Sequence, residues 1–245
     1  MNSVIKTMEK QKSILSPQER RQRNRDRNRE EMKAAILDAA RAVMREEGVA
    51  ALNLQEVARR VGVRAPSLYE YFPGKAAIYD ALFRMGVRLF AERSELLVQT
   101  YPSLWERARA SLEQYMTFAQ DYPELYQLVF ERPVPGFVPS EESMNESRQL
   151  LMGRADQIVE QGLEQGSLVP GLSPVQARDL FIAMTHGLTA LHMANEPELP
   201  VGAGRFGSLI PAAMALFQAS WDPEYSKRAT ETATDSFDPS AQSQE

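Results

Sequence analysis

The stretch LQEVARRVGVRAPSLYEY, residues 54–71, decides how this chain folds, because its small and apolar residues fall where two short helices must cross closely. Ala58 leaves room for a second helix to approach. Four residues later, Gly62 permits a turn backbone that a Cβ would resist. Apolar residues around this turn supply the wedge between the helices: Val57, Val61, Val63, Leu68 and Tyr71. The pattern predicts a helix-turn-helix, whose second helix enters the major groove of DNA.

The flanking residues predict two further helices next to this pair. A first helix is predicted over 28–47, because apolar residues recur there at three- and four-residue spacing and Gly48 stands where a C-terminal cap belongs. Asn53, with a glutamate three residues later, resembles a capping box for the second helix. The third helix should run from about residue 64 to the Pro-Gly pair that follows residue 72. A long helix is then predicted over 75–99.

Beyond residue 100 the chain reads as more helices, which proline and glycine separate. The segment RPVPGFVPS, residues 132–140, contains too much of both for regular structure. No strand-like alternation of useful length occurs. The helices predicted here cover residues 103–121, 123–132, 141–165, 174–194 and 205–220. The predicted fold class is therefore all-α, with a three-helix helix-turn-helix head and a larger helical domain.

Charge is distributed unevenly, although the whole chain carries a net −5. Residues 1–90 hold 18 Lys/Arg and 11 Asp/Glu, whereas residues 91–245 hold 10 and 22. A basic head on an acidic body is expected when one domain neutralises phosphates and the other does not contact DNA, although chance asymmetry also explains it. The charged tract that ends residues 1–27 is either an arm that reaches DNA or a solvated extension of the first helix.

Composition excludes several other kinds of site. The chain has 245 residues, no cysteine and two histidines, so disulfides and thiolate metal sites are excluded, and we predict no metal site and no cofactor. No apolar run approaches the roughly 18 residues that a membrane span requires. The polar N-terminus lacks the apolar core of a secretory signal. We therefore expect a cytoplasmic protein without a membrane partner.

The stretch 30–84 resembles the TetR/AcrR family of bacterial transcriptional regulators. The resemblance rests on residues at fixed spacing: Ile36, Ala39, Ala40, Gly48, Asn53, Ala58, Gly62, Val63, Leu68, Tyr69, Tyr71, Phe72 and Lys75. Two later segments, PELYQLVFERP at 123–133 and Thr-His-Gly-Leu at 185–188, are similar to the C-terminal domain called WHG. Thr185 stands where that domain has its tryptophan.

The resemblance implies the division of the chain and its partners. It implies a helix-turn-helix DNA-binding domain over 28–75 and a helical effector-binding and dimerisation domain over 76–221. A basic flexible arm, 1–27, precedes them, and a disordered tail, 222–245, is expected because it is poor in apolar residues. The expected partners are a double-stranded DNA operator, a small-molecule effector and a second copy of the chain.

The head supplies the predicted DNA contacts. Free N–H groups at the starts of the second and third helices suit phosphate oxygens. The guanidinium of Arg64 can pair with a guanine, whereas Tyr69, Tyr71 and Lys75 resemble the family's phosphate contacts. The predicted DNA-binding set is Asn53, Gln55, Arg64, Ala65, Ser67, Tyr69, Tyr71 and Lys75.

Two positions in the third helix have more than one interpretation. Tyr71 is either a phosphate contact or mainly a core residue. The carboxylate of Glu70 is repelled by phosphates, so it points sideways, pairs with a basic neighbour or accepts from a cytosine amino group.

The resemblance also implies a homodimer that binds a near-palindrome through its last two long helices. The residues predicted at this interface are Leu180, Met184, Leu188, Leu209, Ala213 and Phe217. Such an apolar stripe is otherwise explained as the core of one chain.

The body is rich in aromatic and adaptable side chains, which suit a lipophilic or aromatic effector. The residues predicted to line its pocket are Trp105, Tyr115, Phe118, Tyr122, Tyr126, Met152 and His186. Each is also explained as ordinary core. His186 and His192 do not face one site on a helix, so they are not expected to bind a metal.

The favoured interpretation is a ligand-responsive repressor that a small effector releases from DNA. A DNA-binding regulator without an effector is the alternative. An enzyme on a helical bundle has no support, because no nucleophile–base pair, metal-ligand cluster or glycine-rich phosphate loop occurs.

Overall fold

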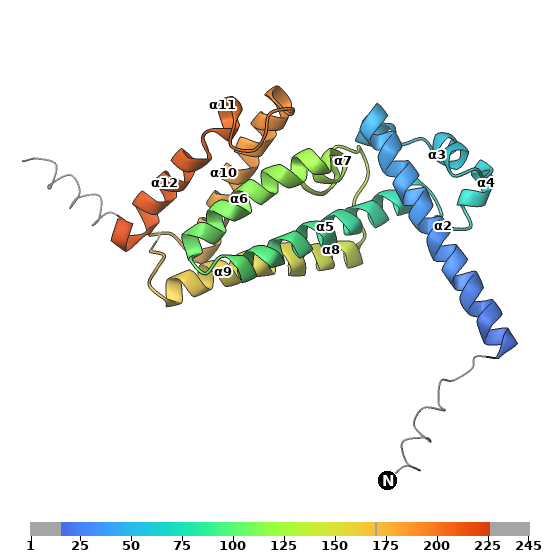
Figure 1. Ribbon diagram of the computed structural model, residues 1–245, viewed down its shortest axis with the longest axis horizontal. Helices are drawn as coiled ribbons and strands as arrows, with labels where there is room; N and C mark the ends of the chain where they lie inside the picture. Colours follow the sequence, from blue (N-terminus) through green and yellow to red (C-terminus); the bar gives the residue numbers. More distant parts are fainter. Residues whose placement is uncertain (1–15, 170, 226–245) are drawn as a thin grey trace, which may run out of the picture. The chain divides into compact units, whose positions relative to one another are not determined.

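The computed structural model describes residues 16–169 and 171–225, and all regular elements of that part are helical (Figure 1). The chain divides into two compact units, Met1–Ile78 and Tyr79–Glu245. The first unit ends inside the long helix predicted from Lys75. Residues 1–15 of the expected arm and 226–245 of the expected tail lie outside the described residues.

The first unit is built on one long helix, α2 (Pro17–Glu47). We expected this helix to begin near residue 28 and residues 1–27 to be flexible, which is wrong for 17–27. The reason is local: Ser16 and Glu19 close a capping box, with Glu19 N 3.3 Å from Ser16 Oγ and Ser16 N 2.7 Å from Glu19 Oε2. Pro17 at the first helical position is pre-organised for the helix.

Three short elements complete the head: η1 (Val49–Ala51), α3 (Leu54–Arg60) and α4 (Ala65–Leu68). Their common core consists of residues at most 3% exposed: Ile36, Ala40, Val43, Met44, Val49, Leu52, Val57, Ala58 and Leu68. Arg60 of α3 also binds Glu46 of α2, with its Nη2 2.6 Å from Glu46 Oε2. The head is therefore closed by an apolar core with an ion pair at its edge.

The turn between α3 and α4 confirms the role expected of Gly62, which has a φ of +74°. Val63 N donates to Ala58 O across the turn at 3.0 Å. The third helix is shorter than predicted, since α4 ends at Leu68 and residues 69–71 continue as turns. Phe72 N still bonds back to Leu68 O at 2.9 Å, so the chain stays wound against the core.

The second unit is a bundle of helices, and α5 enters it from the first unit. Its larger elements are α5 (Lys75–Thr100), α6 (Leu104–Asp121), α8 (Glu141–Ser147), α9 (Gly153–Glu164), α10 (Pro174–Asn195) and α12 (Ile210–Trp221). Its short elements are α7 (Pro123–Tyr126), the π-helical segments η2 (Gln127–Glu131) and η3 (Arg148–Met152), and α11 (Gly204–Gly207).

Several predicted helix boundaries in this unit are confirmed by their caps. Ser103 Oγ accepts from Glu106 N at 3.4 Å at the start of α6, and Ser173 closes a capping box at the start of α10. Two predicted helices are interrupted, however. The helix expected over 141–165 contains the π-helical segment η3 between α8 and α9, and the helix expected over 205–220 is divided into α11 and α12.

The core of this unit lies where α6, α10 and α12 meet. One cluster of buried residues comprises Leu112, Met116, Ile210 and Met214, and a second comprises Leu168, Ala177, Phe217 and Trp221. Gly86 lets α5 pack closely on α7 and η2, because a Cβ there would lie 2.8 Å from Val129 Cγ2. Asp80 of α5 accepts from Ser143 Oγ at 2.8 Å, which fixes α8 against α5.

Candidate DNA interface and effector cavity

The start of α3 provides one part of the candidate DNA interface. The Asn53 side-chain oxygen accepts from Gln55 N at 3.0 Å, which confirms the predicted cap and leaves the amide nitrogen of Asn53 free to donate. Both residues are exposed. Glu56 does not close the expected capping box: it binds Arg59 and Arg60, whose hydrogen bonds lower its pKa to about 2. Glu56 therefore pairs with both arginines, and Arg60 has a second carboxylate partner in Glu46.

The start of α4 and the residues after it present the other predicted contacts. Arg64 occupies the N-cap of α4 with its side chain exposed, and Tyr69 is 58% exposed. Lys75, the first residue of α5, is exposed as well. Ala65 and Ser67 are half-buried. The first unit thus brings a hydroxyl, a guanidinium and an ammonium to its surface near one short helix.

Tyr71 differs from these residues because it is half-buried beneath an arginine. The guanidinium carbon of Arg29 lies 5.4 Å from the centre of its ring, a cation–π arrangement. Arg29 Nη2 also donates to the main-chain oxygen of Glu70 at 2.8 Å. Arg29 therefore contacts residues 64–71, which carry most of the predicted DNA contacts and which we name the recognition segment. No spacing rule in the sequence linked residues so far apart.

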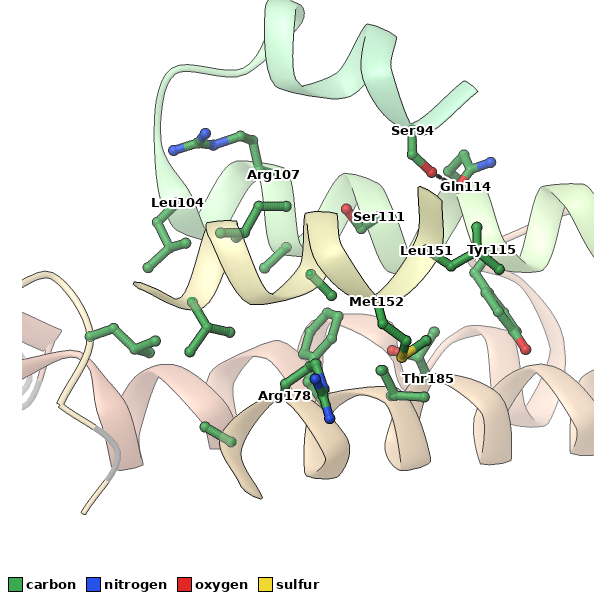
Figure 2. Close-up of a pocket in the computed structure, with 18 of the residues that line it drawn as sticks. Ser94, Leu104, Arg107, Ser111, Gln114, Tyr115, Leu151, Met152, Arg178 and Thr185 are labelled. Atoms are coloured by element: carbon green, nitrogen blue, oxygen red, sulfur yellow. Dashed lines mark hydrogen bonds between the residues drawn. The ribbon is translucent and has the colours of Figure 1, made fainter. Parts of the chain in front are cut away.

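The second unit contains a mostly apolar, partly open cavity of about 240 Å³, and Figure 2 shows residues that line it. Side chains from α5, α6, α9 and α10 line it, together with Trp221 at the end of α12. Two arginines are among its lining residues: Arg178 pairs with Asp156 and Asp179, whereas Arg107 Nε is buried without a partner in the described structure. The cavity therefore suits a mostly apolar molecule, and the buried guanidinium nitrogen of Arg107 gives one part of its wall an unpaired donor.

The sequence predicted part of this lining. Trp105, Tyr115 and Met152 line the cavity, as expected. The other four predicted residues do not. Phe118 and Tyr126 are at most 1% exposed and belong to an aromatic core around Phe130, because the helix turns them away from the cavity.

Tyr122 and His186 have other partners instead. Tyr122 lies under Arg93, whose guanidinium carbon is 4.9 Å from the ring centre. His186 Nδ1 is 2.9 Å from the hydroxyl oxygen of Tyr115. Burial raises the pKa of Tyr115, so this hydroxyl stays protonated. His186 therefore orients a lining residue without lining the cavity itself.

Four buried polar atoms beside the cavity have no hydrogen-bond partner within the described residues. They are Trp105 Nε1, Arg107 Nε, Gln114 Nε2 and Thr185 Oγ1. Three of the four are nitrogen donors. Because a buried polar group without a partner costs roughly 1–3 kcal/mol, the cavity favours a molecule that brings hydrogen-bond acceptors.

Both π-helical segments contribute to the lining. Phe130 belongs to η2, and Leu151 and Met152 belong to η3. A π-helical turn inserts an extra residue and rotates the side chains that follow, and such turns are frequent at functional sites. Apolar periodicity over 141–165 predicts one regular helix, so it did not indicate the π-helical segment η3.

The surface of α10 and α12 differs from the predicted dimer interface. Ala213 and Phe217 are only 6% and 3% exposed, so these two predictions are wrong: they pack inside one chain. Met184 and Leu188 are partly buried against the same core. Leu180 and Leu209 are exposed, as are Leu191 and Leu216, so their place in a dimer interface stays a prediction.

Two family models match this chain. Residues 36–82 match the model described as "Bacterial regulatory proteins, tetR family", and residues 108–214 match "Tetracyclin repressor-like, C-terminal domain". The chain belongs to the TetR family. It is thus a TetR-family transcriptional regulator, a class of DNA-binding proteins rather than enzymes. The more specific WHG-type assignment stays a prediction.

Relatives of this TetR-family chain include regulators of different kinds. The transcriptional activator FasR of Mycolicibacterium smegmatis is 30% identical over 103 residues, which are 42% of this chain and 47% of FasR. The nucleoid occlusion factor SlmA of Marinobacter nauticus is 23% identical over 140 residues, 57% of this chain and 70% of SlmA. The matched part of FasR is therefore about half of its length.

The fold of a Bacillus subtilis regulator, FadR in complex with stearoyl-CoA, is also similar. Its TM-score is 0.60 at 20% identity, and the match covers 75% of this chain and 96% of FadR.

Two further observations concern the TetR-family chain itself. Across residues 16–169 and 171–225, no group of three or more His, Asp or Glu residues is placed to hold a metal ion. Nor does any helix in that part combine the length and apolar character needed to cross a membrane.

We expect Thr185→Val to stabilise the effector-free protein. Thr185 is 5% exposed and its hydroxyl has no partner in the described structure, so the isosteric methyl removes a desolvated polar group without breaking a hydrogen bond. The free energy of unfolding should rise by about 1 kcal/mol. Chemical denaturation followed by circular dichroism measures this.

Thr117→Val is the matched control, because Thr117 Oγ1 donates to Glu113 O at 2.8 Å. That variant should gain nothing. Equal responses of the two variants would show that the Thr185 hydroxyl is satisfied in solution.

Proposed function

We propose that this TetR-family regulator binds a near-palindromic operator as a homodimer, represses transcription there and is released by a small apolar effector. The observation that carries the proposal is the 240 Å³ apolar cavity in the second unit, beside which four polar atoms lack partners. A cavity maintained at that cost to stability is best explained by a ligand that fills it.

The chemistry of the cavity supports one class of effector. Its walls are mostly aliphatic and aromatic, and its unpaired polar atoms are mainly donors. An acyl chain or ring system with a carbonyl or carboxylate oxygen matches both properties. The similar FadR structure contains stearoyl-CoA, an acyl thioester, which agrees with this class.

The exposed surface of α10 supports the homodimer. Leu180, Ala183, Gly187, Leu191 and Ala194 follow one another at three- and four-residue spacing along one face of the helix. A Cβ added at Gly187 would meet nothing within 4 Å, so this face is open in the single chain. Small residues between leucines allow a second helix to approach closely.

The face of α12 continues this surface with Leu209, Ala212, Leu216 and Ala219. Such an apolar surface on a soluble chain usually marks an interface. The arrangement supports packing of α10 and α12 against the same helices of a second copy, around a two-fold axis.

Substitutions of Arg64 and Lys75 should separate base reading from phosphate binding. Arg64→Ala should reduce discrimination between the operator and a mutated operator by roughly 1–3 kcal/mol, because a guanidinium can read a guanine. Lys75→Ala should weaken binding to both DNAs equally and reduce the salt slope by about 0.9 per subunit. Fluorescence anisotropy with an operator selected from random DNA measures both. A uniform loss in Arg64→Ala would remove Arg64 from the base-reading residues.

Charges placed on the exposed leucines should separate the dimer. Leu180→Glu and Leu216→Glu, at positions 47% and 62% exposed, should give monomers, because each would bury a carboxylate opposite its own copy. Leu96→Glu, at a position 61% exposed on α5, is the matched control and should stay dimeric. Light scattering after size-exclusion chromatography gives the mass. A dimeric Leu180→Glu, Leu216→Glu double variant would place the interface elsewhere.

An effector screen tests the proposed release. Fatty acids and fatty acyl thioesters should raise the melting temperature, whereas alkanes of equal length should raise it less, because they bring no acceptor for the unpaired donors. Ala155→Phe, which fills part of the cavity, should abolish the shift and preserve DNA binding. Each hit is then added to the operator complex. Hits that bind without releasing DNA would support the alternative, a regulator without a small-molecule effector.

The position of the operator tests the sign of regulation. Repression requires that the bound dimer overlaps the site of RNA polymerase. The relative FasR is an activator, so activation is the outcome to be tested against repression. An operator upstream of the polymerase site, with transcription that rises on addition of the protein, would replace repression by activation.

A further inference from the structure

The N-terminal half of α2 lies outside the packed core of the head. Every residue from 16 to 31 is exposed, whereas the buried residues of the helix begin at Ile36. Figure 1 shows this half of α2 continuing past α3 and α4. The capping box at Ser16 and the hydrogen bond from Gln22 Nε2 to Asp26 Oδ1, 2.8 Å, support it as a helix. A solvated helix of this length needs a reason other than core packing.

One face of this exposed half is a row of arginines. Arg21, Arg25 and Arg29 follow at intervals of four residues, so they lie on one side of the helix. At intervals of three and four, the same face continues through Met32 and Ile36, which point toward the head's core. One face of α2 is therefore apolar where the helix packs in the head and basic where it is exposed. We name Arg21, Arg25 and Arg29 the arginine row.

The arginine row is joined to the candidate DNA interface. Arg29, its last member, donates to the main-chain oxygen of Glu70 and lies over the ring of Tyr71. Both residues directly follow the exposed Tyr69. The other two members thus extend outward from the recognition segment along a straight helix. The distance from Arg29 to Arg21 along the axis is about 12 Å, which equals the rise of roughly three to four base pairs.

The nearby acidic residues do not neutralise the row. Residues 17–29 contain six arginines and two acidic residues. Glu19 is occupied by the capping box, and Asp26 accepts from Gln22. Arg25 donates to the neutral Gln22 Oε1 at 2.9 Å. Within the described residues, neither Arg21 nor Arg25 pairs with a carboxylate, so both guanidinium groups are available to an anionic partner.

We propose that the arginine row binds the phosphate backbone of DNA that flanks the base pairs contacted by α4. The inference rests on the proposed DNA-binding function and extends its footprint. Phosphates are the matching occupant, because guanidinium groups bind their oxygens in a bidentate manner and the row begins at the recognition segment. The contact carries no sequence information, so it adds affinity and salt dependence at any flanking sequence.

A pair of double variants tests the row. Arg21→Ala with Arg25→Ala removes two of its members, and Arg23→Ala with Arg27→Ala removes the same charge from the opposite side of the helix. Affinity is measured for the operator with ten flanking base pairs on each side and for the trimmed operator. The first double variant should bind the flanked operator roughly tenfold more weakly and lower the salt slope by about two per subunit. It should bind the trimmed operator like the parent.

The controls separate this inference from the proposed function. Arg23→Ala with Arg27→Ala should change both affinities less than twofold. Arg21→Lys with Arg25→Lys should retain most of the affinity, and circular dichroism verifies that every variant keeps its helix content. Lys75→Ala should weaken binding to both DNAs. Unchanged binding in this variant would contradict the proposed DNA contacts of the head and would leave the proposal for the arginine row unaffected.

Two results would overturn the inference. Equal losses in the two double variants would mean that only the overall charge of the helix matters. Unchanged binding in Arg21→Ala with Arg25→Ala would mean that the row does not contact DNA. In the second case, loss of binding to vesicles that contain phosphatidylserine would assign the row to a lipid surface.

Discussion

The close crossing of α3 and α4 is the constraint on which the head depends. Gly62 adopts a φ of +74°, and Val63 N bonds to Ala58 O, so the chain reverses within a few residues. Ala58 is buried at this crossing, and a larger side chain would separate the two helices. The position of Arg64 and Tyr69 on one surface follows from this turn. An α4 of four residues can present them only because the turn fixes its direction.

The second unit differs from the head, because a cavity remains between its helices. Ligand binding that pairs the nitrogen donors beside the cavity would stabilise the conformation that holds the ligand. Two π-helical segments place Phe130 and Met152 at this cavity at some cost in helical regularity. A molecule that fills the cavity and pairs these donors would therefore increase the stability of the protein. This is the physical basis on which a small molecule can shift a conformational equilibrium.

Sequence patterns predicted the elements that local interactions determine. Asn53, Ser103 and Ser173 cap the helices expected of them, because a cap needs only residues within three positions. The patterns failed where the outcome depends on distant residues. Apolar spacing cannot tell that Phe217 packs inside one chain while Leu216 is exposed, because both lie on the same apolar helix. Likewise, Tyr115 and Phe118 are both aromatic residues of α6, and only the packing around them decides which lines the cavity.

The start of α2 is also determined by local interactions. Arginine and glutamine are compatible with a helix and with disorder, so composition alone did not predict that the capping box at Ser16 makes residues 17–27 helical. Once the helix is formed, its periodicity determines which arginines share a face. A disordered arm would distribute its charge over many directions, whereas a helix that meets Glu70 through Arg29 gives its arginines one direction. Helix formation thus turns a basic composition into a surface of defined geometry.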